Sequence, residues 1–276
     1  LCGAYMDDKS CAVAALIALE ELKGKDLSCD ICLLLSGQEE SYGAGLRTRV
    51  FDACPDEILV VDVDLGNTPE TDAAKTVKPG EGPSVAVSVQ TDRKMTKELL
   101  RIAREREIPV QPAMNVKSTG TNASSAPFLL GGVPTAVIGL PLKYMHTCVE
   151  TLYKKDLLNT GRLIAAYIEE RFGKGGTAES QQNSIRFFPH FRRNSALQAV
   201  SAGWRHCLKR NFPAFAIALV IEWEVLSAIC REREKSSCWL PTWTRPALWS
   251  QTLTTRAISA LLPRGMRILP AFSANI

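Results

Sequence analysis

The 276-residue chain is 46% apolar and 22% charged, an ordinary globular composition, so nothing prevents it from burying a core. No apolar run reaches the ~18 residues of a membrane-spanning helix, and no basic-then-apolar signal sequence opens the chain. Nine unevenly spaced cysteines are more typical of reduced thiols than of a disulfide framework. We therefore expect a cytoplasmic protein with no membrane partner.

Charge is distributed unevenly along the chain. Residues 177–276 contain 13 Lys and Arg side chains against five Glu and no Asp, whereas residues 1–176 contain 20 basic and 24 acidic side chains. These counts give net charges of +8 and −4 for the two parts. We therefore expect a folded domain over residues 1–175, followed by a basic tail over residues 176–276.

Helix-like and strand-like segments alternate in the first part at the spacing of βαβ units. In chain order, the pattern predicts a helix at Lys9–Lys23, a strand at Ile31–Leu35, a helix at Tyr42–Phe51, strands at Ile58–Val63 and Ser84–Val89, a helix at Thr91–Arg106, a strand at Thr135–Leu140 and a helix at Leu152–Phe172. This alternation predicts a layered α/β domain. The tail has no sustained period; Ala214–Ile229 could be helical in isolation, and we assign the tail no fold.

Three acidic pairs lie where predicted strands end or helices begin: Asp7 with Asp8, Glu39 with Glu40, and Asp62 with Asp64. Ligands of open α/β sheets gather at the carboxyl ends of the strands, so these carboxylates could converge there with His146. Such a set suits zinc, cobalt or manganese. Taken singly, each group also has an ordinary structural explanation, as a helix cap, a solvated loop or a structural histidine.

Adjacent Glu39 and Glu40 could divide two tasks. One carboxylate would bind a metal ion while its neighbour accepts a proton from water and returns it to the leaving amine. A two-ion site would also need one carboxylate shared between the ions.

Several motifs resemble peptidase family M42 in both order and spacing. They are Tyr5-Met6-Asp7-Asp8-Lys9-Ser10, Ser36-Gly37-Gln38-Glu39-Glu40, Val61-Asp62-Val63, Gly120-Thr121-Asn122-Ala123, and the segments Gly131–Ala136 and Leu140–Thr147. The resemblance covers residues 1–173. It implies the C-terminal part of a three-layer α/β/α zinc-peptidase domain, and a metal-dependent aminopeptidase that removes N-terminal residues from peptides.

Residue by residue, the resemblance implies two divalent ions, zinc or cobalt with manganese as a further option. Asp7 would bridge both ions, Glu40 and Asp62 would each bind one, His146 would be a further ligand, and Glu39 would be the general base. The family uses one more ligand histidine, in a His-Met-Asp-Glu type segment, and a β-rich inserted domain for homo-oligomer assembly. Neither is recognisable in residues 1–175, so we expect one ion to lack a ligand.

The tail suggests an explanation for the missing segment. If the codons of residues 237–259 are re-read from each third base, they permit a sequence of that His-Met-Asp-Glu type. Trp243 followed by Thr244 must then encode Asp. We therefore hypothesise that the tail is an out-of-frame reading of a neighbouring gene copy. Two other functions remain open: a catalytically inactive α/β fragment and, less favoured, a nucleic-acid binder built on the basic tail.

Overall fold

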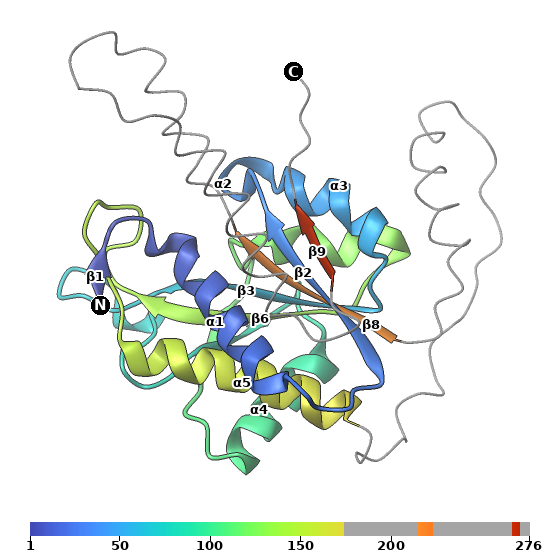
Figure 1. Ribbon diagram of the computed structural model, residues 1–276. Helices are drawn as coiled ribbons and strands as arrows, with labels where there is room; N and C mark the ends of the chain where they lie inside the picture. Colours follow the sequence, from blue (N-terminus) through green and yellow to red (C-terminus); the bar gives the residue numbers. More distant parts are fainter. Residues whose placement is uncertain (174–214, 223–266, 271–276) are drawn as a thin grey trace, which may run out of the picture.

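Seven strands form the central sheet of the protein, in the order β5-β4-β6-β3-β8-β2-β9. The computed structural model describes residues 1–173, 215–222 and 267–270 (Figure 1). The strands are β2 (Cys29–Ser36), β3 (Glu57–Leu65), β4 (Ser84–Ser88), β5 (Gln111–Asn115), β6 (Thr135–Leu142), β8 (Phe215–Glu222) and β9 (Arg267–Pro270). Strand β4 runs antiparallel to β6, and every other pair is parallel. A small antiparallel sheet joins β1 (Cys2–Gly3) to β7 (Glu150–Thr151).

Helices cover both faces of the central sheet (Figure 1). Alternate residues of a strand point to opposite faces, so Leu59 and Val61 of β3 join one core while Ile58 and Val60 join another. The first core includes α1 (Met6–Leu22), α4 (Arg93–Glu105) and α5 (Lys154–Phe172); the second includes α3 (Ala44–Ala53). The predicted three-layer α/β/α architecture is therefore confirmed.

Strand β8 corrects one expectation from the sequence. Residues 215–222, which could have been helical in isolation, instead form a strand between β2 and β3. Leu219 pairs with Leu33 on one side and with Leu59 on the other. Ile217, Leu219, Val220 and Ile221 are fully buried. Pairing with β2 and β3 therefore determines the conformation of this apolar run. The local sequence pattern alone did not determine it.

Other expectations can be compared only in part. The hypothesis about residues 237–259 lies outside the described residues. Cys2, Cys11, Cys29 and Cys148 have free thiols, but Cys54 is disulfide-bonded, so the expectation of reduced cysteines is wrong at that position. Within the described ranges, no helix combines the length and the apolar character needed to cross a membrane.

Helix α1 carries Asp7 and is held in place by its contact with α5. Gly161 of α5 permits close approach: a Cβ atom there would lie 2.7 Å from Ile17 Cγ2 and 2.9 Å from the Ala14 carbonyl oxygen. Both neighbours belong to α1, and Ala14 is fully buried. Because residue 161 has no side chain, α1 and α5 can pack at this short distance.

Replacing Gly161 by Ala should destabilise the protein, although Ala favours helix formation by about 1 kcal/mol relative to Gly. The clash with α1 should outweigh this gain and lower the free energy of unfolding by about 1–3 kcal/mol, as overpacked cores do. Urea unfolding measures the change. The control is Arg162→Ala, whose side chain is 60% exposed, with an expected change within about 0.5 kcal/mol. Unchanged or increased stability of Gly161→Ala would contradict this packing argument.

Candidate metal centre

The five predicted site residues come from four separate segments. Asp7 lies in the first turn of α1, and Glu39 and Glu40 begin the short helix α2 (Glu39–Tyr42) just after β2. Asp62 lies within β3 and not in the loop after it, because that strand extends to Leu65. His146 lies in the loop that follows β6.

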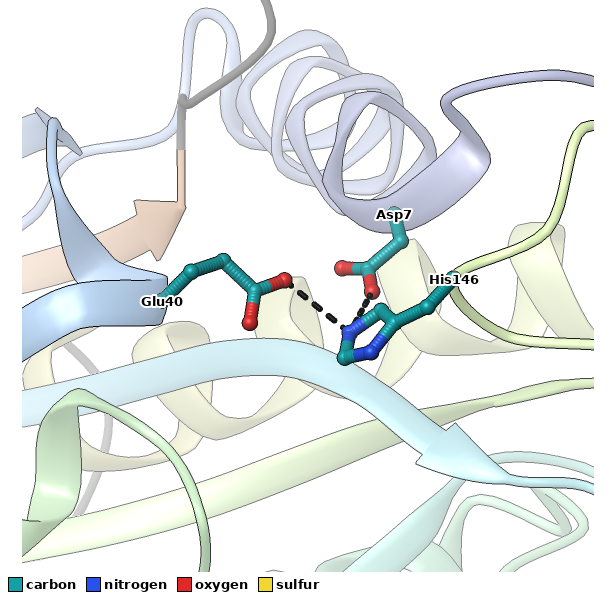
Figure 2. A group of neighbouring side chains, drawn as sticks. All are labelled: Asp7, Glu40 and His146. Atoms are coloured by element: carbon teal, nitrogen blue, oxygen red, sulfur yellow. Dashed lines mark ion pairs between the residues drawn. The ribbon is translucent and has the colours of Figure 1, made fainter.

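Three of these side chains meet at one point (Figure 2). His146 Nε2 lies 3.1 Å from Asp7 Oδ2 and 3.0 Å from Glu40 Oε1. The side chain of Asp7 is only 6% exposed, whereas those of Glu40 and His146 are 40% and 60% exposed. The group is therefore buried on the Asp7 side and open on the other.

A second group shares Asp7 with the first. Asp7, Asp8 and Asp62 each place a carboxylate oxygen within 4.8 Å of the others. Asp8 is 2% exposed and Asp62 is 5% exposed. Asp7 thus stands between two clusters of ligand-type atoms, one with an imidazole and one made of carboxylates.

Burial and mutual repulsion alter the protonation of these carboxyl groups. Burial, followed by the negative charge of Glu40, raises the pKa of Asp7 to about 6. Burial also raises the pKa of Asp62 well above its ordinary value, with the charges of Asp8 and Glu39 acting in the same direction. Glu39 is half-buried, and its effect on Asp62 places its charge beside the second group.

The donor set fits divalent metal ions. Asp7 Oδ1 is buried and has no hydrogen-bond partner among the described residues, which is costly unless a cation binds it. One N–H group at His146 Nε2 can donate a well-aligned hydrogen bond to only one of the two carboxylates of Asp7 and Glu40. A cation, in contrast, can bind all three side chains. Carboxylates with one imidazole are ligands that zinc, cobalt and manganese accept. Within the described chain, Cys29 and Cys32 join no ligand cluster of three or more side chains.

Two residues near the centre were not predicted to have a role. Asp8 belongs to the second group, and its position beside Asp7 in the sequence was the available signal. Glu150 is 2% exposed and accepts hydrogen bonds from backbone N–H groups at Met6, Asp7 and His146. No local pattern marks Glu150, because Met6 and Asp7 lie more than 140 residues away in the chain.

The fold and the grouped acidic side chains define a layered α/β protein with a candidate centre for divalent cations. The family model described as M42 glutamyl aminopeptidase matches residues 1–163. The chain therefore belongs to the M42 glutamyl aminopeptidase family.

Known relatives agree with this assignment. The chain is 31% identical over 166 residues to a lysyl aminopeptidase of Pyrococcus furiosus, covering 60% of this chain and 47% of that protein. An aminopeptidase structure from the archaeon Desulfurococcus kamchatkensis has a TM-score of 0.52 at 26% identity, over 61% of this chain and 49% of that one. A TET aminopeptidase from a marine sediment Thaumarchaeota archaeon gives 0.53 at 25% identity, over 60% and 48%. The chain thus spans about half the length of these relatives.

The raised pKa of Asp7 predicts how the stability of the metal-free protein depends on pH. The folded state keeps this proton up to about pH 6, whereas the unfolded chain releases it near the ordinary value of 3.8. Unfolding between these values releases a proton, so this contribution to stability should be lost as pH rises through the window. Thermal unfolding in a chelator should show a steeper decline for the wild type than for Asp7→Asn.

Saturating zinc serves as the control for this pH series. A bound cation favours the ionised carboxylates, so zinc should remove most of the decline in the wild type. Parallel pH profiles for the wild type and Asp7→Asn in chelator would show that the Asp7 carboxyl is not perturbed by its surroundings.

Proposed function

We propose that this chain is a metal-dependent aminopeptidase that hydrolyses N-terminal residues from peptides and binds two divalent ions of zinc, cobalt or manganese. The observation that carries the proposal is the position of Asp7 in both ligand groups. A carboxylate shared between two neighbouring ions is what a two-ion hydrolytic centre requires. Membership of the M42 glutamyl aminopeptidase family supports the same activity.

Each site residue has a role under this proposal. Asp7 would hold both ions, Glu40 and His146 would complete the first group, and Asp62 would bind the ion of the second group. Bound ions would supply Lewis acidity toward the peptide carbonyl and toward a water molecule. These assignments follow the distances from His146 Nε2 to Asp7 and Glu40, and the burial of Asp62.

Glu39 is proposed as the general base. Its carboxylate would accept a proton from the attacking water as the water oxygen bonds to the carbonyl carbon. When the carbon–nitrogen bond breaks, the same proton would pass to the nitrogen of the leaving amine. Glu39 suits this role because it is half-buried beside Asp62 and belongs to neither ligand group.

A second candidate function is cation binding without hydrolysis. The group of Asp7, Asp8 and Asp62 contains only carboxylates among the described residues, without the additional histidine that the family resemblance implies. An ion held there would have fewer protein ligands and weaker affinity. Homo-oligomer assembly and a cytoplasmic location stay predictions, as do the boundaries of the catalytic domain at residues 1–175.

Glu39→Gln should abolish hydrolysis while leaving metal binding intact. An amide keeps the size of the side chain but cannot accept the proton, so we expect at least about a 100-fold loss of kcat with an aminoacyl chromogenic substrate. Isothermal titration with zinc should give the same affinity for both proteins. The matched control is Glu81→Gln, whose side chain is 59% exposed in a surface ion pair.

The outcomes separate the two candidate functions. Full activity of Glu39→Gln would remove the general-base assignment. Zinc binding by the wild type without any cleavage would favour the non-hydrolytic alternative, and absence of both would contradict both.

A further inference from the structure

Glu150 connects the start of α1, which carries Asp7, to the loop that carries His146. Its Oε2 atom accepts hydrogen bonds from the backbone N–H of Met6 at 2.6 Å and of Asp7 at 3.2 Å. Its Oε1 atom accepts one from the backbone N–H of His146 at 2.9 Å. With Glu150 only 2% exposed, one buried carboxylate holds the backbone of two separate candidate ligands.

The start of α1 needs this acceptor. The first N–H groups of a helix have no partner within the helix, and a side chain at the N-cap position usually accepts from one of them. Tyr5 occupies that position, with φ 63° and no side-chain capping bond. Asp7 and Asp8 have non-helical φ and ψ, so the N–H groups of Met6 and Asp7 precede the regular part of α1, and Glu150 accepts both from a distant segment.

His146 needs a tether for a different reason. Its φ of 63° lies in the left-handed region, which residues other than glycine seldom occupy unless surrounding contacts hold them there. Packing restrains this backbone conformation little, because the His146 side chain is 60% exposed. The hydrogen bond from its backbone N–H to Glu150 therefore restrains the loop.

The local strands place Glu150 between its partners. In the small sheet, Glu150 of β7 pairs with Gly3 of β1, three residues before Met6. On the other side, Thr151 exchanges hydrogen bonds with Lys143, three residues before His146. The two segments that pair with β7 thus lead directly to the start of α1 and to the loop that carries His146.

We propose that Glu150 is a positioning residue that holds Asp7 and His146 in register for binding one cation. The inference rests on the proposed function, because it concerns the same centre. Glu150 belongs to neither group of ligand-type side chains, and both its oxygens accept backbone N–H groups, so its assigned role is to hold the two ligands in place. The 3.1 Å separation of His146 Nε2 and Asp7 Oδ2 is the distance that this arrangement maintains.

Asp156 offers a matched control for this role. It is fully buried and also accepts two backbone N–H groups, from Gly80 at 2.5 Å and Gly82 at 2.9 Å. These hydrogen bonds tie a different loop to the start of α5, and Asp156 belongs to neither ligand group. Replacing Asp156 by Asn therefore perturbs a similar buried acceptor of backbone N–H groups that is not part of the centre.

The experiment compares Glu150→Gln with Asp156→Asn in the full chain by two readouts. Cobalt titration followed by visible absorption should show about tenfold or greater loss of affinity and an altered spectrum for Glu150→Gln, as is typical when support of a metal ligand is removed. Asp156→Asn should keep the wild-type spectrum and an affinity within about twofold, even if it lowers stability, because Asp156 accepts from Gly80 and Gly82 and belongs to neither ligand group.

Amide hydrogen exchange of the metal-free proteins gives the second readout, which does not depend on metal binding. Exchange at Met6, Asp7 and His146 should accelerate in Glu150→Gln and stay at the wild-type rate in Asp156→Asn. Wild-type exchange at these amides in Glu150→Gln would overturn the proposal, as would equal losses of cobalt affinity in both variants. If the wild type binds no cobalt, the proposed function fails, and the exchange rates still decide whether Glu150 tethers the start of α1 to the loop that carries His146.

Discussion

Asp7, Asp8 and Asp62 bring three carboxylate oxygens within 4.8 Å of one another in a part of the protein where water is largely excluded. Like charges at this separation repel when desolvated. The raised pKa values follow first from burial, to which the charge of Glu40 adds at Asp7 and the charges of Asp8 and Glu39 add at Asp62. Without a counter-charge, this arrangement costs free energy that the rest of the fold must supply. A site that carries such a cost is a candidate for function, with a cation as the natural counter-charge.

The surrounding structure holds the carboxylates together against this repulsion. Asp62 is fixed within β3, whose neighbours β6 and β8 pair with it on both sides. Strand β8 also separates β3 from β2, so it sets the distance between Asp62 and the helix that carries Glu39 and Glu40. Asp7 approaches from α1, which packs against α5 through Gly161. Asp62 and Asp7 are thus attached to elements with their own buried contacts, whereas His146 lies in a loop.

Much of this arrangement could be predicted from the sequence. Helical periodicity predicted the helix that became α1, and apolar runs predicted β2 and β3, because these segments carry their own burial pattern. The expected convergence of carboxylates with His146 matches the grouping of Asp7, Glu40 and His146, whereas the roles of these residues stay predictions. Strand β5 was missed because Pro112 argues against a strand, yet β5 is an edge strand, where proline is tolerated. Glu150 was missed because its partners are brought together only by tertiary structure.

Geometry brings Asp7, Glu40 and His146 together, and the location of bound metal tests most directly whether these side chains bind a cation. The measurement is anomalous X-ray diffraction from crystals of the zinc-loaded chain, collected at the zinc absorption edge. We expect a peak among Asp7 Oδ2, Glu40 Oε1 and His146 Nε2, with metal–ligand distances of about 2.0–2.2 Å. Zinc bound at Cys29 and Cys32 instead, or no peak near Asp7, would contradict the account.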